Sequence, residues 1–395
     1  MKPHGKVQLH SKAVKKLRNF YPFLYSDEIS RIEGAPEAGD LIEVIAPDGE
    51  KIGIGFYHPT AHIRVRMFDL GSSPRPSEQL IEERMGKAIQ RRQDFFSPTR
   101  NSIRLVHAEA DQLPGLIVDQ YDRYLVLQIR SAGMEPFRNL ATQYLKKQLK
   151  PAGILERSDM AQRKEEGLVL RTDLLSGEVP EKIKIKEHNL SLWVNPYHGH
   201  KTGYYLDQYD TREKFFNLVK PNETVLDVFQ YTGSFGVGAA KLGAHVVGIE
   251  LDETAIALAK ENSLLNDVSS NMDFLNGDAF YLLQAKAAQR EKFDWVLLDP
   301  HSLAKRRDDI PQGRYGLQKL VKNALLCLNP EGKLLVSLCA YHLLDIFEEV
   351  LRITAGDLGK RICLLDQSRQ SADHPYILQI PETLYLRSLF CQVLG

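Results

Sequence analysis

Four acidic side chains lie at, or just beyond, the carboxyl ends of apolar runs that predict buried strands: Asp227, Glu250, Asp278 and Asp299. In an open α/β sheet, ligands bind outside the carboxyl ends of the strands. We expect Glu250 to accept hydrogen bonds from two ribose hydroxyls and Asp278 to accept one from an exocyclic amine. Any one of these acids is as readily a helix cap or a turn former, but four on successive strands favour a ligand site.

The string DVFQYTGSFGVG (227–238) follows the first of these strands and spaces its glycines G-x-x-G-x-G. A dinucleotide fingerprint requires G-x-G-x-x-G, and a P-loop requires a following lysine. Neither pattern is present, which argues against an NAD-dependent enzyme. A glycine turn with a ribose-binding acid but no phosphate site suits an adenosine ligand without phosphates. S-adenosylmethionine is such a ligand, and carboxylates suit its sulfonium better than amides do.

The four cysteines form no C-x-x-C pair, which argues against a zinc site. In a reducing compartment we expect them to be free thiols. Cys339 ends the apolar run KLLVSLC (333–339), at the same edge as the acids, and is either a nucleophile or a buried strand thiol. We expect the others to be core thiols, because they fall inside apolar helical or strand patterns: Cys327, Cys363 and Cys391.

The chain length of 395 residues predicts two or three domains, at roughly 150 residues each. Lys+Arg and Asp+Glu both number 51, which excludes a uniformly basic surface. No apolar run approaches the roughly 18 residues of a membrane span. The first residues lack the apolar centre of a signal peptide, so we expect a cytoplasmic protein without a membrane partner.

Basic residues nevertheless gather locally. The first 25 residues contain no acid, and form either an arm that attracts a phosphate backbone or a solvated tail. Its candidate RNA-binding residues are Lys12, Lys15, Lys16 and Arg18, and those of a later loop are Lys305 and Arg306. Further residues that would extend a phosphate track, or are simply solvated, are Arg91, Arg92, Arg100, Arg104, Arg307 and Arg314.

Three stretches of the chain differ in their pattern. Residues 1–72 alternate short apolar runs with Gly, Pro and Asp, and predict a small β domain with a hairpin turn at Asp48-Gly49. Residues 73–187 combine helical and strand patterns and predict a central α+β domain. From residue 188 to residue 395, nearly all-apolar strands alternate with helices, which predicts an α/β domain with a doubly wound parallel sheet.

The chain resembles the bacterial 23S rRNA 5-methylcytosine methyltransferase family over nearly its whole length. The motifs that carry the resemblance are YPFLYSDEI (21–29), AEADQLPGLIVDQY (108–121), HKTGYYLDQYDTR (200–212), DVFQYTGSFG (227–236) and SRQSADHP (368–375). The resemblance implies an N-terminal β-barrel PUA domain that binds RNA, a central α+β domain, and a class I, Rossmann-like methyltransferase domain. It also implies S-adenosyl-L-methionine as cofactor, 23S rRNA as partner, no metal, and a homodimer.

The same resemblance assigns residues to the cofactor. It implies methionine contacts near Tyr231 and Gly233, ribose at Glu250, adenine at Asp278 and the reaction centre beside Asp299. The complete set of candidate cofactor residues is Tyr205, Gln208, Asp227, Tyr231, Gly233, Phe235, Glu250, Asp278 and Asp299.

Methylation of cytosine at carbon 5 requires activation of the ring, because this carbon is a poor nucleophile. Enzymes of this chemistry add a thiolate to carbon 6, and the resulting enamine attacks the methyl sulfonium through carbon 5. A base then removes the carbon 5 proton and the thiolate leaves. Cys339 aligns with the cysteine that the family carries after the fifth strand, and Asp299 is the candidate acid for the cytosine edge.

Two departures from the family pattern leave the target base open. The string DPHS (299–302) stands where D-P-P-K is expected, and SLCAYH (337–342) stands where Ser-Cys-Ser and small residues are expected. His301 is either a proton acceptor or a polar loop residue, and Tyr341 and His342 either crowd the base or stack on it. The alternatives are a methyltransferase that acts on another RNA base or atom, and an RNA-binding family member without catalysis.

Overall fold

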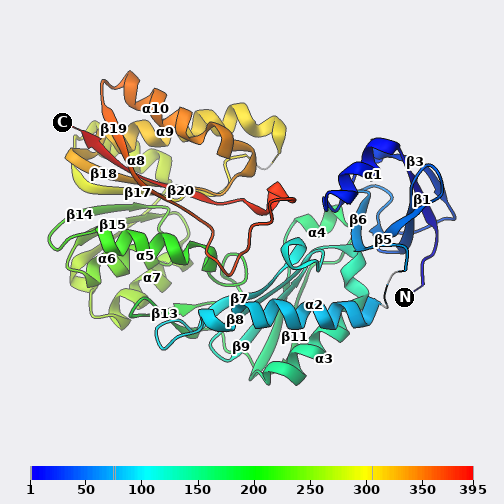
Figure 1. Ribbon diagram of the computed structural model, residues 1–395. Helices are drawn as coiled ribbons and strands as arrows, with labels where there is room; N and C mark the ends of the chain where they lie inside the picture. Colours follow the sequence, from blue (N-terminus) through cyan, green and yellow to red (C-terminus); the bar gives the residue numbers. More distant parts are fainter. Residues whose placement is uncertain (1, 74, 76, 305, 395) are drawn as a thin grey trace. The chain divides into compact units, whose positions relative to one another are not determined.

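The computed structural model describes residues 2–73, 75, 77–304 and 306–394, and the chain divides into two compact units (Figure 1). Unit 1 comprises Met1–Ile183, Asn195–Tyr204 and Asp373–Thr383. Unit 2 comprises Lys184–Val194, Tyr205–Ala372 and Leu384–Gly395. Each unit therefore combines segments that are distant in the sequence. The division into three domains at 1–72, 73–187 and 188–395 stays a prediction.

The N-terminal part of unit 1 is a six-stranded sheet with the order β2-β6-β5-β4-β1-β3. Its strands are β1 (Lys6–Leu9), β2 (Phe23–Leu24), β3 (Ile29–Glu33), β4 (Leu41–Ile45), β5 (Lys51–Tyr57) and β6 (Val65–Leu70). The turn between β4 and β5 contains Asp48-Gly49, as predicted. Gly49 donates its N–H to the Ala46 carbonyl at 3.0 Å and has a φ of +88°, which glycine adopts without strain.

The basic N-terminal stretch is part of this sheet domain and not a solvated tail. It contains helix α1 (Ser11–Arg18), whose apolar face packs on the sheet. The buried side chains of that face are Ala13, Val14 and Leu17. The basic residues occupy the remaining helix positions, because an amphipathic helix keeps its charged side chains in water.

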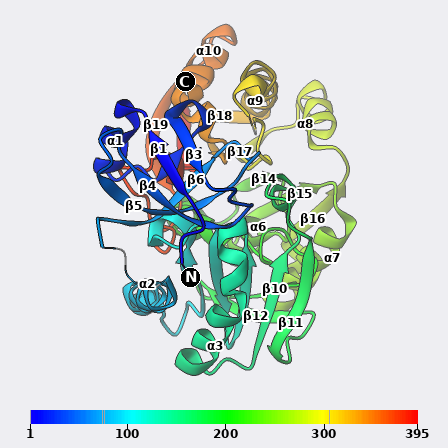
Figure 2. The same cartoon turned by 90° about the vertical axis from the view of Figure 1, so that its right-hand side faces the viewer.

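The second sheet of unit 1 has five strands in the order β11-β10-β9-β8-β7. They are β7 (Ser102–His107), β8 (Leu116–Tyr121), β9 (Tyr124–Ile129), β10 (Gly153–Ser158) and β11 (Arg171–Gly177). Helices α2 (Ser77–Arg92) and α3 (Arg138–Leu149) contact each other and share one apolar core with this sheet (Figure 2). A short helix, α4 (Gln162–Glu165), precedes β11. The mixture of helices and strands agrees with the α+β pattern of the sequence.

Three arginines that were candidates for a phosphate track are buried inside unit 1, and that prediction is wrong for them. The ion pairs are Arg92–Asp111, Arg100–Asp373 and Arg104–Asp119. Each guanidinium is neutralised by a buried carboxylate, so a phosphate cannot reach it without breaking a buried pair. Arg91 is about half exposed but also pairs with Asp111, at 2.9 Å.

Unit 2 is built on a seven-stranded sheet with the order β16-β15-β14-β17-β18-β20-β19. The strands are β14 (Thr224–Val228), β15 (His245–Glu250), β16 (Met272–Asn276), β17 (Phe293–Leu298), β18 (Leu328–Leu338), β19 (Arg361–Arg369) and β20 (Arg387–Leu394). The first five of these pair in parallel, and β20 pairs antiparallel with both β18 and β19. A hairpin of β12 (Ile183–Glu187) and β13 (Leu190–Val194) precedes the sheet.

Helices cover both faces of this sheet (Figure 1). One face holds α5 (Tyr209–Leu218), α6 (Ser234–Lys241) and α7 (Glu253–Leu265), and the other holds α8 (Ala279–Ala288), α9 (Ile310–Leu326) and α10 (Phe347–Asp357). This arrangement confirms the predicted doubly wound domain. The strand order reverses between β14 and β17, and such a switch point opens a ligand crevice at the carboxyl edge of the sheet.

Among the described residues, no helix combines the length and the apolar character that crossing a membrane requires.

Candidate active site

The loop from β14 to α6 bends sharply at the carboxyl edge of the unit 2 sheet. Phe229, Tyr231 and Gly233 all have positive φ, at +66°, +50° and +77°. Bulky side chains rarely adopt this region, and such strain is concentrated at functional sites. Gly233 precedes the first turn of α6, and a Cβ added to it would lie 3.1 Å from the Ala259 Cβ of α7. Both the turn and the close helix therefore require glycine here.

The Asp227 carboxylate is buried beneath this loop and accepts the N–H of Gly236 at 3.1 Å. Burial raises the pKa of Asp227 to about 7, and the negative charges of Asp299 and Glu250 act in the same direction. The hydrogen bond from Gly236 acts against this rise but does not cancel it. Near neutral pH the carboxyl group is thus divided between its protonated and ionised forms.

Replacing Asp227 with Asn should remove a pH dependence of stability. The folded chain binds the Asp227 proton more tightly than the unfolded chain does. Its stabilising contribution is therefore complete below about pH 4 and is lost as the pH rises through about 7. At pH 8 we expect D227N to be more stable than the wild type, by at most roughly 4 kcal/mol at about 1.4 kcal/mol per pKa unit.

Urea unfolding at pH 5 and pH 8, followed by tryptophan fluorescence, measures this difference. Both tryptophans, Trp193 and Trp295, lie in unit 2. Asp273→Asn on β16 is the matched control, because that side chain is exposed. An equal pH dependence in D227N and the wild type would contradict the assignment of this titration to Asp227.

Glu250 ends β15 with its carboxylate held by three backbone N–H groups. Oε2 accepts from Tyr231 at 2.9 Å, and Oε1 accepts from Leu251 and Asp252 at 2.8 and 3.1 Å. These donors fix the orientation of the carboxylate and tie it to the glycine loop. Two oxygens offer about four acceptor positions, so one position remains for a hydroxyl without disturbing this arrangement.

Asp278 follows β16 and caps helix α8, as does Asp252 for α7. The Asp278 carboxylate accepts the N–H of Tyr281 at 3.0 Å, and the side chain is exposed. The structural role of a helix cap therefore holds for this acid. Its adenine contact stays a prediction, which exposure at the sheet edge permits.

Asp299 follows β17 and lies next to Gln208. The Gln208 Nε2 donates to Asp299 Oδ2 at 3.1 Å, which brings together residues 91 positions apart in the sequence. The segment Leu206–Gln208 is held in turn by Ser371, which donates its N–H to the Asp207 carbonyl and its hydroxyl to the Leu206 carbonyl, both at 2.9 Å. Ser371, in the string SRQSADHP, therefore holds the backbone next to Gln208 in place.

Tyr205 joins this group of side chains. Its ring meets the Tyr231 ring edge-on, with centroids 5.3 Å apart. Burial raises the pKa of Tyr205 far above its ordinary value, and the neighbouring charges of Asp299 and Cys339 act in the same direction. The phenol therefore stays protonated and is a hydrogen-bond donor close to both candidate catalytic residues.

Three buried polar side chains in this region are Gln208, Gln230 and Thr232. Gln208 was a candidate cofactor residue, whereas Gln230 and Thr232 were not, although both stand in the string DVFQYTGSFG. Among the described residues, no hydrogen-bond partner contacts Gln208 Oε1, Thr232 Oγ1, or either polar atom of the Gln230 side-chain amide. Buried polar atoms are normally paired, so each such atom requires an explanation, such as a bound ligand or water. They are therefore candidates for contact with a bound ligand.

Phe235 was a candidate cofactor residue, and that contact stays a prediction. Phe235 is buried on α6, where its ring packs on Phe215 with centroids 5.9 Å apart. Arg212, in the string HKTGYYLDQYDTR, is also buried; it forms an ion pair with Glu187 and donates through Nη2 to the Tyr205 carbonyl at 3.0 Å.

The four cysteines differ in their surroundings. Cys327 and Cys391 are buried, and burial raises the pKa of their thiols to about 11 and about 12, so both are inert core groups as predicted. Cys363 is exposed, and its assignment to the core is wrong, because β19 is the edge strand of the sheet. Cys339 directly follows β18 and is partly exposed, the condition that a nucleophilic thiol requires.

The candidate RNA-binding residues also fall into different groups. Lys16 pairs with Glu28, and Arg18 pairs with Glu50 at 2.6 Å. Lys12, Lys15 and Arg306 are exposed, whereas Lys305 lies outside the described residues. Phosphate contact by any of them stays a prediction.

Of the residues in the two departing strings, His301 is exposed, and Tyr341 is 39% exposed with its ring edge-on to that of His342 at 5.5 Å. Within the described parts of the chain, no group of three or more His, Cys, Asp or Glu side chains is arranged to hold a metal ion.

Comparison with known proteins defines the class. Residues 7–70 match a PUA-like domain family, and residues 219–378 match a methyltransferase domain family. A proposed SAM-dependent methyltransferase from Streptococcus mutans has a similar structure, with a TM-score of 0.85 at 20% identity, over 98% of this chain and 100% of that one. A proposed methyltransferase complexed with SAH gives 0.86 at 20% identity, over the same shares. The chain combines a PUA-like domain with the SAM-dependent methyltransferase fold.

Curated relatives identify the family. The chain is 35% identical over 385 residues to ribosomal RNA large subunit methyltransferase I of Aliivibrio fischeri (strain ATCC 700601 / ES114), covering 96% of this chain and 97% of that protein. It is 35% identical over 386 residues to the protein of the same name from Citrobacter koseri, with the same coverage. The chain belongs to the ribosomal RNA large subunit methyltransferase I family.

Proposed function

We propose that this protein is a cytoplasmic methyltransferase that transfers a methyl group from S-adenosyl-L-methionine to carbon 5 of a cytosine in large-subunit rRNA. The observation that carries the proposal is that Asp299 and Cys339 follow the neighbouring parallel strands β17 and β18, which pair with Leu298 opposite Val336. Both therefore lie at the carboxyl edge of the unit 2 sheet, as does the strained glycine loop. The names of the relatives support an rRNA substrate, and the PUA-like domain supports RNA binding. The homodimer implied by the family resemblance stays a prediction.

The chain's own groups fit this cofactor. Glu250 would accept a ribose hydroxyl, Asp278 an exocyclic amine, and the buried polar atoms of Gln208 and Thr232 would contact the methionine end. When bound, S-adenosylmethionine supplies an electrophilic methyl group on a positive sulfonium. Ionised Asp227 is stabilised by a nearby positive charge, so cofactor binding is expected to lower its raised pKa.

In the proposed reaction the Cys339 thiolate forms a bond to carbon 6 of the cytosine, and the ring electrons become available at carbon 5. Carbon 5 would take the methyl group as the methyl–sulfur bond breaks, with S-adenosylhomocysteine as the leaving group. Carbon 5 then loses its proton to a base, and the electron pair of that C–H bond expels the thiolate. Asp299 hydrogen-bonds the cytosine edge while Gln208 holds the carboxylate in place.

Nucleoside mass spectrometry tests the proposal. Total rRNA from cells with and without the protein is digested, and 5-methylcytidine is quantified in the large-subunit fraction. We expect one site to lose this modification when the protein is absent. A 5-fluorocytidine-containing RNA should trap a covalent adduct through Cys339, because fluorine at carbon 5 blocks the elimination step.

A second candidate function is methylation of another base or atom by the same cofactor. It is favoured by His301 and Tyr341, which are exposed beside the proposed reaction centre in place of the expected residues. Appearance of a different methylated nucleoside, together with no 5-fluorocytidine adduct, would support it. Failure of the protein to bind S-adenosylhomocysteine in calorimetry would instead indicate an RNA-binding protein without catalysis.

A further inference from the structure

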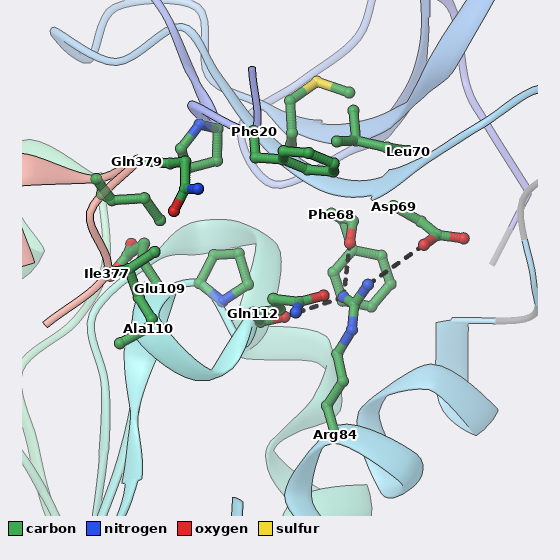
Figure 3. Close-up of a pocket in the computed structure, with 14 residues that line it drawn as sticks. Phe20, Phe68, Asp69, Leu70, Arg84, Glu109, Ala110, Gln112, Ile377 and Gln379 are labelled. Atoms are coloured by element: carbon green, nitrogen blue, oxygen red, sulfur yellow. Dashed lines mark hydrogen bonds and ion pairs between the residues drawn. The ribbon is translucent and has the colours of Figure 1, made fainter. Parts of the chain in front are cut away.

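Unit 1 contains a cavity of about 500 Å³ that is separate from the candidate active site (Figure 3). It lies between β6 of the N-terminal sheet, the turn before β8, and the segment Asp373–Thr383. A volume of this order is typical of small-molecule pockets, which are mostly apolar with a few convergent polar groups. Its apolar lining includes Phe20, Phe68, Leu70, Pro114 and Ile377.

Phe20, which lines this cavity, has a strained backbone and an exposed side chain. It is the second residue after α1, its φ is +64°, and its side chain is 66% exposed. A bulky aromatic residue with positive φ is a backbone outlier, and an exposed aromatic ring lacks the burial that usually offsets such a cost. Aromatic rings exposed on RNA-binding domains serve as stacking platforms for unpaired bases.

The charges around the cavity do not favour a phosphate. The Arg84 guanidinium donates to the Phe68 and Gln112 carbonyls at 2.6 and 2.9 Å and pairs with Asp69 at 3.3 Å. Burial lowers the pKa of Arg84 to about 10, but the group stays charged and is compensated by this carboxylate. Glu109 adds a second carboxylate at the cavity wall, which pairs with Arg66 at 3.4 Å, so the positive charges near the cavity are already compensated and do not attract a further anion.

Glu109 is instead arranged to accept hydrogen bonds from a neutral ligand. Its Oε1 is 3.4 Å from the Arg66 Nη1, a long contact, and its Oε2 has no hydrogen bond to another described residue. The exposed amides of Gln112 and Gln379 also line the cavity. In Figure 3, Phe20 and Gln379 lie on one side of the cavity and Ala110 and Gln112 on the other.

We propose that this cavity binds one unpaired nucleobase of the RNA substrate, stacked on Phe20 and read by Glu109. Guanine is the expected base, because it alone among the four RNA bases offers two adjacent N–H donors on its Watson–Crick edge to one carboxylate. This inference rests on the proposed RNA substrate. It adds a second recognition point, within unit 1, to the target cytosine at the active site of unit 2.

Binding of a short single-stranded oligoribonucleotide with one central guanosine tests the proposal, by fluorescence anisotropy on the full-length protein. Removing a stacking ring by Phe20→Ala should weaken binding about 5- to 100-fold. Glu109→Gln should weaken the binding of guanosine-containing RNA more than the binding of the same RNA with inosine, which lacks the exocyclic amine. Val169→Ala is the control, because Val169 is equally exposed in unit 1 but does not line the cavity.

Three outcomes decide the question. Selective loss of affinity for the guanosine-containing RNA in both variants supports the proposal. Unchanged affinity of F20A and E109Q for RNA overturns the proposal. A lower affinity of these variants for free guanosine monophosphate, with their affinity for RNA unchanged, also overturns it. Calorimetry with S-adenosylhomocysteine is run on the wild type and on every variant. If the wild type does not bind this ligand, the proposed function is wrong; if only the RNA measurements contradict base binding at the cavity, the proposed function still stands.

Discussion

Replacing Cys339 with Ala should abolish methyl transfer to ribosomal RNA, with a loss of about a thousandfold or more. A thousandfold loss corresponds to roughly 4 kcal/mol of transition-state stabilisation. The physical reason is that no other described group near Asp299 has a thiol that can add to carbon 6 of the ring: Cys327 and Cys391 are buried, and Cys363 lies on the edge strand β19. Initial rates with tritiated S-adenosylmethionine and unmodified rRNA measure this loss.

Cys363→Ala is the matched control, because it removes an exposed thiol from the same sheet. Its turnover should equal that of the wild type. Calorimetry should give C339A the same affinity for S-adenosylhomocysteine as the wild type, since the variant lacks a reacting group and not a cofactor contact. If C339A keeps full turnover, the covalent mechanism is refuted, and methylation at another position becomes the better reading.

Replacing Arg212 with Met should destabilise unit 2 by about 3–5 kcal/mol, because it leaves a buried carboxylate without its partner. Arg212 and Glu187 are 1% and 3% exposed, and the Arg212 Nη2 donates to Glu187 Oε2 at 3.0 Å. The same nitrogen also donates to the Tyr205 carbonyl at 3.0 Å. Loss of the guanidinium therefore removes support from the hairpin β12–β13 and from the backbone of Tyr205.

Urea unfolding followed by the fluorescence of Trp193 and Trp295 measures the loss in unit 2. Arg314→Met is the control, because its ion pair with Glu349 is 35% and 41% exposed, and pairs of this kind contribute about 1 kcal/mol at most. The double variant R212M/E187Q should recover part of the loss, since it no longer buries a charge. A loss in R212M no larger than in R314M would contradict this account.

Several features of unit 2 were predictable because local pattern and tertiary environment agree. The strands β14, β15 and β17 are nearly all apolar, as strands covered on both faces must be. Parallel strands align their carboxyl ends, so acids that follow them necessarily share one edge of the sheet. The cap of α7 has a similarly local cause: the Asp252 carboxylate accepts the Thr254 N–H at 2.8 Å, two residues away.

The burial and pairing of charged side chains in the N-terminal half could not be predicted from the sequence pattern. Three arginines look like surface residues in the sequence: Arg92, Arg100 and Arg104. Their carboxylate partners lie in the turn that ends at Asp111, on strand β8 (Asp119), and in the distant segment that contains Asp373. Ion pairing between residues up to 273 positions apart depends on which segments the fold brings together. The solvated-tail alternative for the N-terminal stretch was wrong for another reason: a short amphipathic helix and a basic tail have similar compositions, and only the packing of α1 on the sheet distinguishes them.

By itself, the sequence determined the class of this protein: a doubly wound domain with acids at its strand ends, a glycine turn without a phosphate site, and strings shared with one methyltransferase family. These depend on periodicity and local chemistry, which neighbouring residues define. Only the tertiary structure decided which thiol is accessible beside Asp299, which arginines are neutralised, and that Phe20 and Glu109 line a common cavity. Such facts depend on burial and on contacts between distant segments, and no local pattern encodes them.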